Sequence, residues 1–196
     1  MIKPFSQACE NNKQPILAQL KPVLANAKTV LEVGSGTGQH SVYFAQQLPH
    51  LQWHSSDRAI NHEGINLWHR EVNLTNLHAP LELDLNNAWP IDKVDAIYTA
   101  NTFHIVSWQL VEHFFAGVKQ HLNDQGIVCI YGPFKYKGEF TSQSNNDFNR
   151  FLIERDPLSG IRDFAAVELL AKQAGLTLLS DIAMPANNQL LIFKRQ

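Results

Sequence analysis

The sequence predicts an α/β fold: a Rossmann-like, doubly wound sheet of seven strands, mostly parallel, with an antiparallel last strand. Short apolar runs alternate along the chain with amphipathic helical patterns, which is typical of a parallel sheet covered on both faces. The last two apolar runs, residues 176–183 and 189–194, are separated only by a turn at 184–188. Because this connection is too short for a helical crossover, we expect the two strands to pair antiparallel.

Apolar residues at helical spacing predict a first helix over residues 12–25, in which Pro15 suits the first turn. The further expected elements are strands over 29–33, 51–56, 81–85, 94–100 and 126–131, and helices over 39–48, 60–73, 108–121, 145–154 and 163–174. The stretch 132–146 is rich in Gly, Ser and Asn and interrupts the alternation. Long connections after a strand often hold substrates. We therefore expect residues 132–163 to form an insertion on the substrate side.

Length and composition predict a single domain over residues 1–196, because the chain is 44% hydrophobic and 17% charged. Sixteen basic and eighteen acidic residues give a net charge of −2, so nucleic acid is an unlikely partner. Two cysteines, Cys9 and Cys129, do not make a disulfide framework. No apolar run resembles a signal peptide or a membrane span, so we expect a cytoplasmic protein. The sequence leaves the oligomeric state open.

The most specific motif is a glycine-rich loop at residues 34–38, between an apolar strand and a helix. Gly34, Gly36 and Gly38 are spaced by single residues, whereas a plain strand–helix turn needs only one glycine. Glycines let a ligand approach the backbone closely, and amides at the following helix N-terminus face it. The spacing differs from the dinucleotide fingerprint G-x-G-x-x-G, and no Lys follows Gly38 as a phosphate-binding P-loop requires.

This loop resembles the first motif of the class I S-adenosylmethionine-dependent methyltransferases, an acidic residue on the first strand followed by G-x-G-x-G. Glu32 and the three glycines match it. The resemblance implies S-adenosylmethionine as cofactor, S-adenosylhomocysteine as product, and Ser35 and Thr37 in the same site. Asp57 ends the second strand, where a carboxylate can accept both ribose hydroxyls. Asp57 also suits a dinucleotide site or a helix cap.

Residues after the third and fourth strands extend the predicted site. The resemblance implies that the Asp84 carboxylate and the Leu85 amide contact the adenine, although an ordinary turn is the alternative for Asp84. Asn101 and His104 should line the reaction zone, since ligands of open α/β sheets bind outside the carboxyl ends of the strands. We expect Asn101 to contact both the cofactor and the molecule that receives the methyl group, as a catalytic candidate. His104 is the second catalytic candidate and would take a proton from that molecule; a structural histidine is the alternative. Methyl transfer depends chiefly on proximity, so a general base is not obligatory.

Over nearly its whole length the chain resembles the methyltransferase-like protein 26 family. The matching residues are LEVGSGTGQH at 31–40, YGPF at 131–134, Ser144, Asn145, Asp147 and Phe148, GIRD at 160–163 and MPANN at 184–188. The resemblance implies that His40 belongs to the cofactor site and that residues 1–26, with Asn12, form a lid over it. Helix capping is the alternative for Asn12.

The same resemblance indicates an acceptor pocket after the fourth and fifth strands. Its candidate residues are Phe103, Tyr131, Asn145, Phe148, Arg162 and Asp163. Arg162 would suit a carboxylate or phosphate on the acceptor. The alternative is an ion pair of Arg162 with Asp163, combined with helix capping.

Departures from better-known methyltransferase motifs narrow the range of expected methyl acceptors. Residues 101–104 lack the two prolines of amino-methyltransferases that act on DNA bases, and neither cysteine follows a proline as in cytosine-C5 enzymes. A small molecule or a protein residue is therefore the expected acceptor. The nine histidines lack metal-ligand spacing, so no metal is expected.

The predicted function is S-adenosylmethionine-dependent methyl transfer to an unidentified acceptor. One alternative is a non-catalytic S-adenosylmethionine-binding module or scaffold, because the reaction needs no diagnostic residue. The other is a short NAD(P)-dependent oxidoreductase, which the glycine spacing disfavours. The Tyr-x-x-x-Lys pair of such enzymes occurs only as Tyr131 and Lys135, in a segment interrupted by proline.

Overall fold

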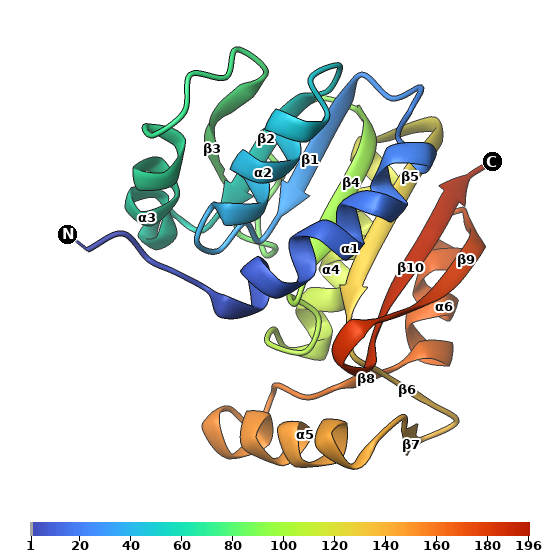
Figure 1. Cartoon of the computed structure of the whole chain (residues 1–196). Coiled ribbons are helices and arrows are strands. Elements are labelled where there is room, and N and C mark those ends of the chain that lie inside the picture. Colours follow the sequence, from blue (N-terminus) through green and yellow to red (C-terminus); the bar gives the residue numbers. More distant parts are fainter. Residues whose placement is uncertain (1) are drawn as a thin grey trace.

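The computed structural model describes residues 2–196 and has a central sheet between two layers of helices (Figure 1). The main strands are β1 (Thr29–Val33), β2 (Gln52–Asp57), β3 (Leu77–Glu82), β4 (Val94–Ala100), β5 (Leu122–Gly132), β9 (Leu176–Met184) and β10 (Asn188–Arg195). They form one seven-stranded sheet in the order β3-β2-β1-β4-β5-β10-β9. Only β10 runs antiparallel to its neighbours β5 and β9, which confirms the predicted fold class.

The helices are α1 (Gln7–Val23), α2 (Gln39–Gln47), α3 (Ala59–His69), α4 (Trp108–His121), α5 (Gln143–Arg155) and α6 (Phe164–Gln173). Side chains along each inner strand alternate between the two faces of the sheet. In β5, Val128 and Ile130 pack with α4 and α6, whereas Cys129 and Tyr131 pack on the side of α1 and α2. Both faces are therefore buried, as the continuous apolar runs of the strands require.

Several boundaries differ from those predicted; α3, for example, ends at His69 rather than at residue 73. The first helix begins at Gln7 because Ser6 accepts a hydrogen bond from the Cys9 amide, so Ser6 is the N-cap and the capping alternative for Asn12 is wrong. The third strand covers residues 77–82 rather than 81–85; Pro80 lies within it, which an edge strand tolerates. The fifth strand begins at Leu122, four residues earlier than expected.

Residues 132–163 contain a small three-stranded sheet of β6 (Phe134–Tyr136), β7 (Glu139–Phe140) and β8 (Arg162–Asp163), together with α5. Figure 1 shows α5 set apart from the two helical layers, below the carboxyl ends of β4 and β5. The β9–β10 connection, η1 (Pro185–Asn187), lies on the same side. Within residues 2–196, no helix combines the length and apolarity needed to span a bilayer.

Candidate functional site

A cavity of about 1150 Å³ opens at the carboxyl ends of the parallel strands. This is the edge at which open α/β sheets bind their ligands. The connections after β1, β2, β3, β4 and β5 all contribute to its wall, as do the N-terminal end of α1, the helix α5 and the β9–β10 turn. Its volume exceeds the roughly 300–1,000 Å³ of a pocket for one small ligand. The cavity therefore has room for two.

The three glycines of the loop have different tasks, although all have positive φ angles. A Cβ on Gly34 would lie 2.7 Å from Thr102 Oγ1, and one on Gly38 would lie 3.0 Å from Ile65 Cα in α3. A Cβ on Gly36 would meet no atom within 4 Å. Gly34 and Gly38 are thus required by the packing of this chain on itself. Gly34 and Gly36 line the cavity and Gly38 does not, and only at Gly36 would a Cβ meet open space.

The floor of the cavity carries a buried carboxyl group, that of Glu32 at the end of β1. Trp53 Nε1 donates a hydrogen bond of 2.7 Å to Glu32 Oε2. Burial raises the pKa of Glu32 to about 7, an effect that hydrogen bonding from polar neighbours such as Trp53 partly offsets. The Ser56 hydroxyl donates to the Glu32 carbonyl, so β1 and β2 are joined at this point.

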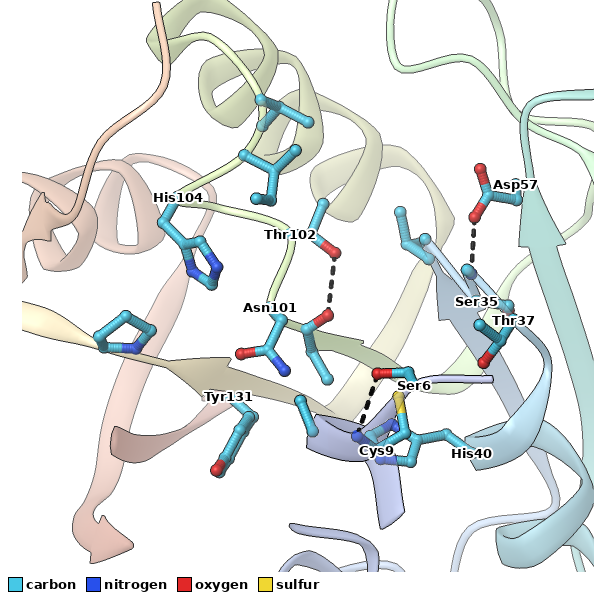
Figure 2. Close-up of a pocket in the computed structure, with 18 of the residues that line it drawn as sticks. Ser6, Cys9, Ser35, Thr37, His40, Asp57, Asn101, Thr102, His104 and Tyr131 are labelled. Atoms are coloured by element: carbon cyan, nitrogen blue, oxygen red, sulfur yellow. Dashed lines mark hydrogen bonds between the residues drawn. The ribbon is translucent and has the colours of Figure 1, made fainter. Parts of the chain in front are cut away.

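Asp57 connects the glycine loop to the start of α3. Its Oδ1 accepts hydrogen bonds from the Arg58 amide (2.8 Å) and Asn61 Nδ2 (2.7 Å), and its Oδ2 accepts one from the Gly36 amide (2.7 Å). Figure 2 shows this carboxylate beside the loop at the cavity edge. Because a carboxylate oxygen can accept two hydrogen bonds, Oδ2 retains one acceptor position for a ligand hydroxyl.

Asp84 and Leu85 line the cavity next to Asp57. Asp84 Oδ1 accepts hydrogen bonds from the Asn86 amide (2.9 Å) and Asn86 Nδ2 (3.2 Å), so this carboxylate also closes a turn. The turn does not exclude a ligand contact, since the second carboxylate oxygen is a further acceptor.

The N-terminal end of α1 is fixed over the glycine loop by two side chains of α2. The buried His40 ring bonds through Nε2 to Asn12 Oδ1 (2.7 Å) and through Nδ1 to Tyr98 Oη (3.1 Å). Burial lowers the pKa of His40 to about 4, so the ring is neutral at pH 7 and donates from Nε2. Gln39 Oε1 accepts from the Ser6 amide at 2.6 Å. These contacts place Asn12 and His40 in the cavity wall.

Residues 101–107, which we name the reaction loop, follow β4. Asn101 lines the cavity in a left-handed conformation (φ 57), and its amide donates to the Tyr131 carbonyl at 2.8 Å. Such conformations are uncommon outside glycine and recur at functional sites. His104 follows at 5% exposure, and Figure 2 shows its ring extending from the loop toward Asn101. Burial, with a smaller effect of the nearby Arg162 charge, lowers the pKa of His104 to about 4.

The reaction loop is held by residues 158–162, which we name the latch segment. Four consecutive carbonyls of the loop accept hydrogen bonds from it. Phe103 O accepts from Arg162 Nε (2.9 Å), His104 O from the Gly160 amide (2.9 Å), Ile105 O from Ser159 Oγ (2.6 Å), and Val106 O from Arg162 Nη2 (2.5 Å). The position of His104 is therefore determined by a segment 54–58 residues further along the chain.

Three predicted acceptor-pocket residues do not line the cavity. The Arg162 guanidinium is occupied by loop carbonyls and by Leu158 O. Asp163 caps α6 by accepting from the Ala165 amide, so the capping alternative is found. The Phe103 ring is buried against Phe114 in the core, with centroids 5.1 Å apart. These side chains bond to backbone carbonyls, cap a helix and pack in the core, and residue type alone did not predict these roles.

The other predicted pocket residues, Tyr131, Asn145 and Phe148, do line the cavity. The buried Asn145 side chain donates from Nδ2 to Thr141 Oγ1 and to Asn187 O, both at 2.9 Å. It thereby joins α5 to the β9–β10 turn. Phe148 packs edge-to-face on His104, with ring centroids 5.4 Å apart.

Several lining residues were not predicted. Ser6 and Cys9 reach the cavity because α1 begins earlier than its apolar periodicity suggested, and Figure 2 shows both beside His40. A serine before a run of helix-forming residues is an N-cap signal that marks this start. Ile105 and Leu158 carry no motif, and their place depends on the contact between the reaction loop and the latch segment.

Several solved structures with the same fold are methyltransferases. An O-methyltransferase family protein from Burkholderia thailandensis superposes with a TM-score of 0.84 at 16% identity, over 96% of this chain and 57% of that one. Mitomycin 7-O-methyltransferase superposes with a TM-score of 0.82 at 14% identity, over 96% of this chain and 54% of that one. Human N-acetylserotonin methyltransferase, solved in complex with S-adenosylmethionine, superposes with a TM-score of 0.81 at 11% identity, over 96% of this chain and 53% of that one. The chain spans little more than half the length of these proteins. At these identities the likeness establishes the fold, which is that of the class I methyltransferases.

A family model provides a match at the level of sequence. It covers residues 3–195, which is almost the whole chain, and its description is a protein of unknown function. The chain therefore belongs to the DUF938 family.

Proposed function

We propose that this protein transfers a methyl group from S-adenosylmethionine to an acceptor bound in the same cavity. The observation that carries the proposal is the open space at Gly36 beside the Asp57 carboxylate, within a cavity larger than one small ligand needs. The fold similarity to methyltransferases supports it, as does the resemblance of residues 31–40 to the methyltransferase-like protein 26 family. We further propose that the protein acts in the cytoplasm.

The chemistry of the lining residues fits this cofactor. Asp57 Oδ2 can accept a hydrogen bond from a ribose hydroxyl, and the Asp84 carboxylate can accept one from the amino group of the adenine. The glycine loop and Asn12, in the proposed lid, line the remaining space. When bound, S-adenosylmethionine supplies a methyl group activated on a positively charged sulfur. The neutral rings of His40 and His104 add no positive charge around it.

The arrangement acts mainly by positioning. Asn101 and His104 lie on the reaction loop between the glycine loop and α5, so they separate the two halves of the cavity. A site that holds two reactants in contact gains rate from orientation alone, without a strong acid or base. The acceptor is therefore expected in the half bounded by the reaction loop and α5.

Calorimetric titration of the purified protein tests the proposal. S-adenosylmethionine and S-adenosylhomocysteine should both bind, and NADH should not. Asp57→Ala should weaken binding about tenfold or more, because it removes a charge-assisted hydrogen bond. Asp124→Ala is the matched control, since Asp124 is an exposed acidic residue at the opposite end of β5. Binding of NADH alone would favour the oxidoreductase. Binding of the sulfur compounds without transfer to any acceptor would favour a non-catalytic binding module.

A further inference from the structure

We infer that the half of the cavity between the reaction loop and α5 binds a small, largely apolar molecule that presents a hydroxyl group to His104. The inference rests on the proposed function, because this molecule is the methyl acceptor. Four observations carry it: the apolar mouth of the cavity, the His104 ring in its wall, the balance of charge around that ring, and the way its position is fixed.

The mouth of this half is lined by large apolar side chains exposed to solvent. Ile105 is 36% exposed, Phe148 37% and Leu158 64%. Phe151, 55% exposed, stacks on Phe148 with the rings inclined by only 18°. Contiguous exposed apolar groups mark surfaces that bind something. Because they edge a concave cavity that continues inward past Tyr131 and Pro133, the ligand they fit is a small molecule with an apolar body.

The His104 ring is the polar group aimed into this half. It is 95% shielded from solvent, and Figure 2 draws no hydrogen bond from it to the other labelled residues. Its nitrogens are not among the fully buried side-chain atoms that lack a partner, and the residue lines the cavity, so the ring can bond to a ligand there. The neutral ring has one nitrogen that accepts and one that donates, which is the complement of a hydroxyl group.

Charge argues against a lysine or arginine side chain as acceptor. The ionisable groups of this half other than His104 and Tyr131 are Arg155 and Asp156, adjacent residues of opposite charge. Asp156 Oδ1 accepts from the Leu158 amide at 3.0 Å, and the charge of this carboxylate is balanced by that of Arg155. A primary amine is protonated at neutral pH, and its burial requires a carboxylate partner. A hydroxyl group is uncharged and needs only the hydrogen bond that His104 offers.

His104 is held firmly enough to select an acceptor. The Gly160 amide bonds to its carbonyl, and Arg162 bonds to the carbonyls of Phe103 and Val106 on either side. The Phe148 ring packs on one edge of the imidazole. On transfer, the acceptor oxygen exchanges its bond to hydrogen for a bond to the methyl carbon. The proton passes to a His104 nitrogen, and the sulfur keeps the electron pair of its broken bond.

The test uses 2-naphthol and a lysine-containing hexapeptide as probes, titrated into the protein saturated with S-adenosylhomocysteine. We expect 2-naphthol to bind and to shift the ring-nitrogen NMR signals of His104, and the peptide not to bind. His104→Phe and Phe148→Ala should each weaken 2-naphthol binding about tenfold. Leu179→Ala is the control, because Leu179 is a large exposed apolar residue on β9, outside the cavity wall.

The outcomes separate this inference from the proposed function. If S-adenosylhomocysteine binds but 2-naphthol does not, or if only the peptide binds, the acceptor class is wrong and methyl transfer stands. If 2-naphthol binds equally well to His104→Phe, the assignment of His104 is wrong. If S-adenosylhomocysteine itself does not bind, both the inference and the proposed function fail.

Discussion

Asn12 and His40 meet inside the protein, where His40 Nε2 lies 2.7 Å from Asn12 Oδ1 and joins α1 to α2. Because burial keeps the ring neutral, it donates from Nε2 to Asn12 while Nδ1 accepts from the Tyr98 hydroxyl. Burial is the largest cause of the low pKa of His40. The docking of α1 on α2 is thereby coupled to pH.

The first prediction concerns acid stability. The pKa of His40 falls from 6.5 in a free side chain to about 4 in the folded protein. The unfolded chain therefore binds the proton first, and stability is lost as the pH falls from about 6.5 to about 4. His40 alone accounts for about 3 kcal/mol across this window. Urea unfolding between pH 7.5 and 4.5 should give a shallower pH slope for His40→Gln than for wild type. An identical slope would contradict the assignment.

Glu32 should act in the opposite direction. Its pKa rises from 4.5 to about 7 on folding, so its stabilising effect is complete below pH 4.5 and is lost as the pH rises through 7. Glu32→Gln keeps an acceptor for Trp53 Nε1 and removes the buried charge. We expect it to raise the free energy of unfolding at pH 8 by about 2 kcal/mol and to change it little at pH 4.5. A variant less stable than wild type at pH 8 would refute this account.

Gly36 and Gly38 should respond differently to alanine. Gly36→Ala meets open space at a left-handed φ of 58, which costs about 1 kcal/mol, but its Cβ occupies the ligand side of the loop. Gly38→Ala combines a φ of 88 with a Cβ pressed onto the Ile65 backbone, so it should destabilise the fold further. Thermal unfolding and S-adenosylhomocysteine titration of both variants separate the two effects. Equal losses of stability would show that the glycines share one role.

Arg162 is expected to be a positioning residue that acts through the reaction loop. Arg162→Met leaves three carbonyls without their donor, which costs about 1–3 kcal/mol of stability for each buried group left unpaired. Methyl transfer to 2-naphthol should lose kcat, and KM should rise by no more than the roughly tenfold weakening of binding expected for His104→Phe, because the ring of His104 is displaced while the apolar mouth persists. Arg162→Lys, with one donor group in place of the fork, should recover part of kcat. A change confined to KM would instead mean that Arg162 contacts the acceptor.

The sheet and the glycine-loop side of the cavity could be predicted because their signals are local. Short apolar runs, a glycine-rich loop and an acidic residue at a strand end are each contained within a few residues. Asp57 and the glycine loop lie side by side because parallel neighbouring strands end at one edge. The antiparallel pairing of the last two strands could also be predicted from their short connection, but the placement of β10 between β5 and β9 could not.

The acceptor side could not be predicted in the same way. Phe103 and His104 are neighbours in sequence, yet one ring enters the core and the other faces the cavity. Arg162 suggested an anion site because guanidinium groups bind carboxylates, whereas its donors are occupied by the protein's own carbonyls. These outcomes depend on contacts across more than 50 residues, which residue type and spacing do not encode.

The latch segment also limits how the length of this chain can vary. Ser159 and Gly160 each donate to one carbonyl of the reaction loop, and Arg162 donates to two. A single inserted or deleted residue between 158 and 162 would therefore displace these donors from the carbonyls that accept from them. The turn at 137–138 is bonded through one amide, from Gly138 to Asp163 Oδ2 (2.7 Å), and a Cβ on Gly138 would meet open space. We therefore expect insertions to be tolerated better at the β6–β7 turn than between Leu158 and Arg162.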